Sequence, residues 1–151
     1  MNWFANVGKY LWSRETTPYF TAPQDMTRSQ ARRETFAYAV FLGSVFGIAG
    51  LAALLASLRQ PGPTELLWAL GSALVLWGCF DLARLRRRIA AWIVALAPGA
   101  VLLQLAVSGF GPKAAGIDKL VITAFLLLLL RYGWRILKIH RLHGGAATDE
   151  Q

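Results

Sequence analysis

The chain has 151 residues, of which 56% are hydrophobic and only 16% are charged, whereas soluble domains carry roughly 25% charged residues. The mean hydropathy is +0.43. The apolar residues form blocks of about 20, separated by joints rich in Arg, Gly and Pro, which is typical of bilayer-spanning helices. The residues outside these blocks are too few to bury a separate core. We therefore expect an all-α integral membrane protein without a soluble catalytic domain.

The net charge of +8 has a simple explanation in a membrane protein, because cytoplasmic loops retain Lys and Arg. A nucleic-acid site would interleave aromatic and basic side chains in a stacking groove, and here the aromatic residues lie at the ends of the apolar blocks. We expect no nucleic-acid partner. The single cysteine, Cys79, excludes a disulfide within the chain and a two-thiol redox mechanism.

The first 12 residues predict a short amphipathic helix, because Trp3, Phe4, Val7, Tyr10 and Leu11 fall on one helical face. Such a helix can lie in the membrane interface, or it can pack on the protein's own helices. Residues 13–26 contain two prolines and several turn-forming residues, which indicates an irregular connector. We therefore interpret residues 1–26 as a cytoplasmic amphipathic segment followed by that connector.

Residues 27–143 predict a domain of four transmembrane helices, with spans at about 36–58, 64–83, 89–110 and 117–137. The first helix is expected to begin at Thr27, which forms a capping-box pattern with Gln30. Its first turns, which carry Arg28, Arg32, Arg33 and Glu34, are expected to form a foot exposed to water. Pro98 predicts a kink in the third helix. Residues 144–151 are expected to form a mobile tail.

The distribution of Lys and Arg predicts the orientation of the four helices. Thirteen of the 16 basic residues fall in the N-terminal arm, the joint between the second and third spans, and the C-terminal end. The other side holds only Arg59, Lys113 and Lys119. This asymmetry favours both termini on the cytoplasmic side. The richness in Arg, Ala and Leu suggests a bacterial cytoplasmic membrane.

Small residues recur at helical spacing on two of the predicted spans and indicate surfaces for close helix packing. The first span carries Ala39, Gly43, Gly47 and Gly50, and the third carries a weaker stripe of Ala91, Ala95 and Gly99. We expect the two stripes to pack against each other within one molecule. The alternative is that they form a surface for a partner helix or a second copy of the chain.

Three polar side chains near or within the apolar blocks are candidates for function: Asp81, Gln104 and Arg131. Asp81 and Arg131 fall at similar depth, so a salt bridge between the second and fourth helices is feasible. One alternative is that Arg131 extends to the lipid headgroups while Asp81 caps the loop after its helix. Another is that both residues take part in transport or in a proton relay. Gln104 is expected to form hydrogen bonds between helices, with Ser72, Ser108 or Thr123 as partners.

The joint before the third span contains Arg84, Arg86, Arg87 and Arg88, a basic patch expected to contact anionic lipid headgroups. His140 and His143 are three residues apart, but no cysteine or acidic cluster accompanies them, so we expect no metal. No motif for catalysis or for a cofactor is present. We expect a non-catalytic accessory or scaffold subunit that binds a membrane protein or itself; the alternatives are a small oligomeric transporter or channel, and then a lipid-modifying enzyme.

Overall fold

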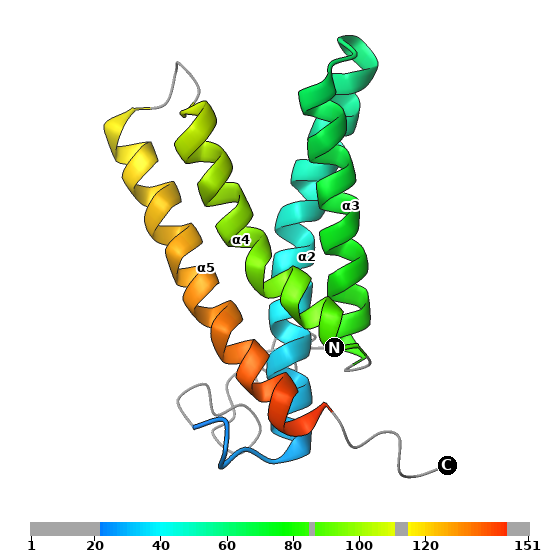
Figure 1. The fold of residues 1–151 in the computed structure, drawn as a ribbon, viewed down its shortest axis with the longest axis vertical. Coiled ribbons are helices and arrows are strands. Elements are labelled where there is room, and N and C mark those ends of the chain that lie inside the picture. Colours follow the sequence, from blue (N-terminus) through cyan, green and yellow to red (C-terminus); the bar gives the residue numbers. More distant parts are fainter. Residues whose placement is uncertain (1–21, 85–86, 111–114, 145–151) are drawn as a thin grey trace, which may run out of the picture.

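A computed structural model describes residues 22–84, 87–110 and 115–144. It contains four helices, α2 (Arg28–Arg59), α3 (Pro63–Ala83), α4 (Arg88–Ser108) and α5 (Gly116–His143), and no strand within the described ranges (Figure 1). Each helix is long and apolar enough to cross a membrane. The prediction of an all-helical protein with four candidate membrane helices is therefore confirmed.

The helix boundaries follow from local sequence signals. At the start of α2 the predicted capping box is present, with Thr27 N donating to Gln30 Oε1 (2.9 Å) and Gln30 N donating to Thr27 Oγ1 (3.4 Å). Pro63 occupies the first position of α3, where its missing N–H costs nothing. Pro98 lies inside α4, which continues through it. The last helix runs on to His143, beyond the apolar run that defined the fourth predicted span.

The helices run up and down, so that α2 begins and α5 ends at the same end of the bundle (Figure 1). α2 packs mainly on α3, and α4 packs mainly on α5. The two hairpins meet through α3 with α4 and α2 with α5. α3 and α5 are therefore diagonal to each other in the bundle.

Buried residues are confined to one half of the bundle, the half that contains the start of α2 and the end of α5. We call this the terminal half and define it as residues 28–46, 72–83, 88–98 and 126–143. The open half consists of the remaining helical residues, 47–59, 63–71, 99–108 and 116–125. The boundary is drawn at the outermost buried residue of each helix, so the open half contains no buried residue by definition. The terminal half contains nearly the whole core, including Leu42, Leu82, Val94, Ile136 and Ile139.

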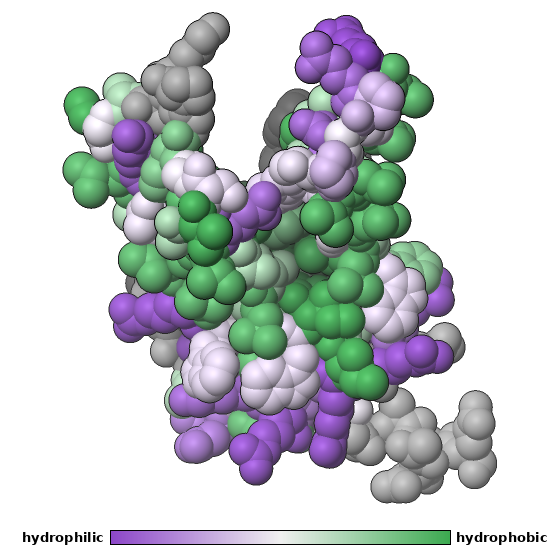
Figure 2. Space-filling model, turned by 45° about the horizontal axis from the view of Figure 1, so that its top comes forward, coloured by the Kyte–Doolittle hydropathy of each residue, from purple (hydrophilic) through white to green (hydrophobic). Residues whose placement is uncertain are grey.

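The two hairpins diverge in the open half. In Figure 1 they are close together at the bottom and separate toward the top, and the space-filling view in Figure 2 shows a notch between them whose visible walls mix polar, intermediate and hydrophobic residues. Both arms of the notch carry large exposed apolar side chains, among them Leu51, Leu67, Leu103 and Leu120. The two hairpins are thus in contact with each other at one end only.

Two of the sequence expectations lie outside the described residues. The amphipathic helix expected at residues 1–12 falls in the range 1–21, and the mobile tail falls almost entirely in the range 145–151. Arg86, one member of the expected basic patch, is also outside the described ranges.

Candidate functional site

A buried ion pair joins α2 to α5 in the terminal half. Glu34 of α2 is 2% exposed, and its Oε1 accepts hydrogen bonds from Arg135 Nε (2.7 Å) and from the Tyr132 hydroxyl (2.7 Å). Arg135 Nη2 donates to the other carboxylate oxygen at 3.3 Å. The guanidinium therefore binds the carboxylate with two nitrogens, which is the strongest geometry for such a pair. We call Glu34, Tyr132 and Arg135 the Glu34 cluster.

Tyr38 lies one turn along α2 from the Glu34 cluster and extends the contact between the two helices. Its hydroxyl donates to the backbone oxygen of Leu129 (3.2 Å), and its ring packs on the ring of Tyr132 with the centroids 5.4 Å apart. A Cβ atom added at Gly133 would lie 3.1 Å from the Tyr38 hydroxyl. The absence of a side chain at Gly133 therefore makes room for Tyr38 beside α5.

The position of Glu34 corrects the expectation of a water-exposed foot on the first helix. The charged residues around it do remain exposed, but Glu34 itself belongs to the buried face that Ala31, Thr35, Tyr38 and Leu42 continue. Residues three and four apart share a helix face, so this spacing could have placed Glu34 inward. On α5, the three-residue spacing of Tyr132 and Arg135 was the matching signal.

The expected salt bridge between Asp81 and Arg131 is not formed. Asp81 Oδ2 lies 3.9 Å from Arg87 Nε, in the joint that follows its own helix, and Arg131 is exposed on α5. The physical reason is that α3 and α5 are diagonal in the bundle. Asp81 therefore lies closer to the joint that follows α3 than to Arg131 on α5. Another member of the basic patch, Arg84, places its guanidinium 4.0 Å from the centroid of the Phe80 ring.

Gln104 is half-buried on α4 in the open half. Among the described residues it makes none of the expected hydrogen bonds to Ser72, Ser108 or Thr123, and the hydroxyl of Ser72 is buried without a partner in the part of the chain that the structure describes. The separation of the two hairpins in the open half (Figure 1) accounts for the missing bond to Ser72, because Gln104 and Ser72 belong to different hairpins.

The two small-residue stripes do not face each other, contrary to expectation. The stripe on α2 faces α3: a Cβ atom added at Gly43 would lie 3.7 Å from Cys79 Cβ, and one added at Gly50 would lie 2.6 Å from Ser72 Cβ. Gly47 similarly faces Leu76. Ala39 is buried on the same side of α2.

The stripe on α4 faces α5. A Cβ atom added at Gly99 would lie 3.4 Å from Leu130, and one added at Gly133 would lie 3.0 Å from the Cα and backbone oxygen of Ala95. Ala91 is buried and lines a groove between the two helices. Each stripe therefore forms the seam within one hairpin.

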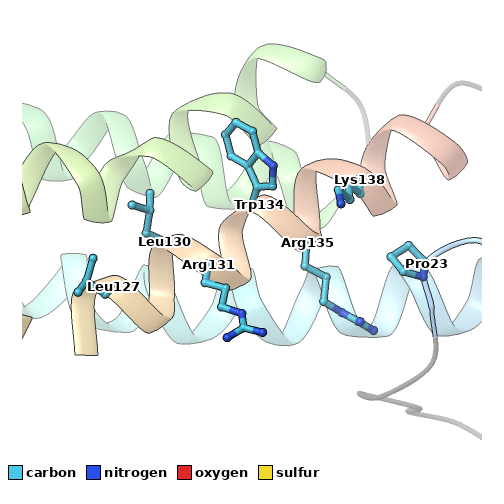
Figure 3. A pocket seen from close by; sticks show the side chains of 7 residues that line it. All are labelled: Pro23, Leu127, Leu130, Arg131, Trp134, Arg135 and Lys138. Atoms are coloured by element: carbon cyan, nitrogen blue, oxygen red, sulfur yellow. The ribbon is translucent and has the colours of Figure 1, made fainter. Parts of the chain in front are cut away.

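The terminal half also carries two surface grooves that share Trp134 and Lys138 of α5. One groove, of about 620 Å³, runs along α5 beside Pro23; Figure 3 shows its lining residues, Pro23, Leu127, Leu130, Arg131, Trp134, Arg135 and Lys138. Arg131 and Arg135 point to the same side of α5, and Trp134 points away from them toward α4 (Figure 3). The other groove, of about 420 Å³, lies between α4 and α5.

Several reactive side chains of the terminal half are already engaged or buried. The carboxylate of Glu34 accepts three hydrogen bonds, and the thiol of Cys79 is buried. Among the described residues no three His, Cys, Asp or Glu side chains gather as a metal site. His143 Nε2 lies 3.1 Å from the backbone oxygen of Met26 and Nδ1 lies 3.3 Å from that of Ile139. A neutral imidazole carries one N–H and donates to one of the two, and the contact with Met26 places the connector against the end of α5.

Comparison with known proteins gives no relative from which a role could be transferred: no protein-family model, no curated protein and no solved structure matches this chain.

Proposed function

We propose that this chain is a non-catalytic membrane subunit that serves as an accessory or scaffold in a membrane complex, and that its open half receives a transmembrane helix of the partner. The observation that carries the proposal is the uneven burial along the bundle, with a packed terminal half and no buried residue in the open half. Lipid provides little hydrophobic drive between helices, so packing area has to provide the association. A helix in the notch would supply that area.

The charges of the terminal half support a structural role for that end. Glu34 and Arg135 are used to join the two hairpins, and Asp81 lies beside Arg87. Charges within a membrane are expensive and mark a pathway when they face a water-filled cavity. Here the buried carboxylate of Glu34 lies between α2 and α5, which favours assembly over conduction.

The membrane setting belongs to the same proposal. With 13 of 16 basic residues in the N-terminal arm, the joint between the second and third spans and the C-terminal end, the positive-inside rule supports cytoplasmic termini, and a bacterial cytoplasmic membrane fits the composition. The basic residues would also attract anionic headgroups, and residues 1–12 would add an amphipathic helix in the interface.

The alternative function is a small oligomeric transporter or channel. Gln104 favours it, because it is a half-buried polar side chain in an otherwise apolar part of α4. Copies of the chain could then join through their open halves and enclose Gln104.

Gly71 offers a variant that separates these outcomes. It is exposed on α3 in the open half, and a Cβ atom added there meets nothing within 4 Å. Gly71→Leu should therefore leave the isolated fold intact while it keeps another helix from approaching α3 closely. Gly116→Leu is the control, since Gly116 also has open space around it but lies at the first turn of α5.

The experiment is purification from native membranes in mild detergent, followed by mass spectrometry and a measurement of mass in solution. We expect a different membrane protein at a fixed stoichiometry with the wild-type chain and with Gly116→Leu, and its loss with Gly71→Leu. A complex made only of this chain would favour the transporter or channel. A monomer without any partner would contradict both proposals.

A further inference from the structure

The groove between α4 and α5 in the terminal half is lined by several basic side chains. Its walls are formed by Arg88, Ala91, Trp92, Trp134, Leu137, Lys138, His140 and Arg141. Three of these, Arg88, Lys138 and Arg141, carry a full positive charge and come from two different helices. None of the three forms an ion pair with a carboxylate of the described residues. The groove therefore presents uncompensated positive charge.

The nearby carboxylates do not neutralise this charge. Asp81 acts electrostatically on His140 with the opposite sign to Arg88, and its carboxylate lies 3.9 Å from the largely exposed Arg87. This single carboxylate offsets only part of the charge of the three cations. Glu34 is engaged by Arg135 on the other side of α5. Positively charged side chains that converge without a counterion repel one another. An anion bound between them removes this repulsion and forms charge-assisted hydrogen bonds.

Two further features of the groove suit an anion. Arg88 is the first residue of α4, and that helix begins without a side-chain cap, so its first backbone N–H groups and the positive end of its dipole lie next to the groove. His140 is 3% exposed, and its Nε2 is buried without a hydrogen-bond partner in the described part of the chain. A buried polar atom of this kind calls for a partner that the described protein atoms do not supply.

The other wall of the groove is aromatic. The rings of Trp92 and Trp134 meet edge to face, with centroids 6.1 Å apart and an interplanar angle of 85°. Each Trp lies four residues deeper along its helix than a basic residue, Arg88 on α4 and Lys138 on α5, so the cations are nearer the end of the bundle. Trp residues favour the headgroup level of a membrane. A charged end beside an apolar wall matches an amphiphile better than a free ion.

We propose that this groove is a binding site for an anionic phospholipid, with the phosphate held by Arg88, Lys138 and Arg141 and the upper acyl chain lying on Trp92 and Trp134. The proposal rests on the membrane-spanning helices and is independent of the accessory role. The proposal also assigns lipid binding to one member of the basic patch expected from the sequence, Arg88. Arg84 stacks on Phe80 and Arg87 lies at Asp81, whereas Arg88 lines the groove.

The test compares two variants that each remove two positive charges from the same end of the bundle. Arg88→Gln with Lys138→Gln removes charges that line the groove, and Arg28→Gln with Arg32→Gln removes exposed charges of α2 that do not. Each protein is reconstituted with an equal mixture of phosphatidylglycerol and phosphatidylcholine and extracted gently. The lipid that stays bound is then counted by native mass spectrometry.

We expect the wild-type chain and the α2 variant to retain phosphatidylglycerol in preference to phosphatidylcholine. The groove variant should lose about five-fold in this preference for each charge removed, since a basic residue near a headgroup contributes about 1 kcal/mol. An unchanged melting temperature in phosphatidylcholine alone would show that the groove variant is folded.

Three outcomes would overturn the proposal. The first is a wild-type chain that does not prefer phosphatidylglycerol, and the second is an equal loss in both variants, which would indicate general attraction to the surface. The third is release of the bound lipid by inorganic phosphate, since the groove would then recognise the free anion.

Discussion

Glu34 joins the two hairpins through a buried ion pair between α2 and α5. Its carboxylate is removed from solvent almost completely, and desolvation of a charge is costly unless the charge is paired and hydrogen-bonded. Arg135 and Tyr132 meet that requirement with bonds of 2.7 Å. Since both partners belong to α5, the carboxylate specifies which helix α2 meets and at what depth.

We expect the pair to be strongly coupled in stability. Glu34→Gln and Arg135→Gln should each lower the free energy of unfolding by about 3 kcal/mol, because each leaves a buried charge or polar group poorly paired. The double variant should lose less than the sum of the two by at least about 1 kcal/mol. Thermal or denaturant unfolding in detergent measures all three.

Arg131→Gln is the matched control, because Arg131 lies one turn away on α5 and is exposed. Its removal should change stability by less than about 1 kcal/mol. Additive losses at Glu34 and Arg135, or a loss at Arg131 as large as that at Arg135, would mean that the Glu34 cluster does not hold the helices together.

At the scale of helices, the sequence predicts which residues share a packing face but not which helix that face contacts. The spacing of Gly43, Gly47 and Gly50 shows correctly that these residues share a face, yet nothing in a repeat of small residues identifies the opposite helix. α2 packs on the next helix in the chain, as short connections favour. Gly133 belongs to no such repeat, so its packing role could not be predicted from the sequence. That role becomes visible only through its closeness to Ala95 and Tyr38.

Gly133 should tolerate no side chain. An added Cβ would lie 3.0 Å from the backbone of Ala95, and a helix backbone cannot move aside as a flexible side chain can. Gly133→Ala should therefore separate α4 from α5 and cost about 1–3 kcal/mol, measured as a lower melting temperature in detergent.

Gly71→Ala provides the comparison on another helix. Its Cβ would meet open space, and alanine is the better helix former, so the melting temperature should stay the same or rise. If Gly133→Ala is tolerated as well as Gly71→Ala, then α4 and α5 do not approach each other at Gly133 as closely as the structure shows.

For the whole molecule, hydropathy predicts the four helices and their order but not the division into a terminal half and an open half. Leu42 is fully buried and Leu51 is 59% exposed, although the same residue type lies in the same apolar run. In a membrane both positions are apolar surroundings, so composition does not separate helix-facing from lipid-facing side chains. The buried charge at Glu34 carries that information, because only a packed interior with a partner can accept it.

At the scale of the whole molecule, the central proposal is that the open half is the surface where a partner helix binds. The most direct test is photo-crosslinking in native membranes, with a photoreactive phenylalanine at Leu67 or Leu103 in the open half and at Ile89 or Leu142 in the terminal half. All four side chains are more than half exposed, so accessibility is matched. We predict adducts with one other membrane protein from Leu67 or Leu103 and none from Ile89 or Leu142. The same adducts from the terminal half alone, or only lipid adducts at all four positions, would contradict the account.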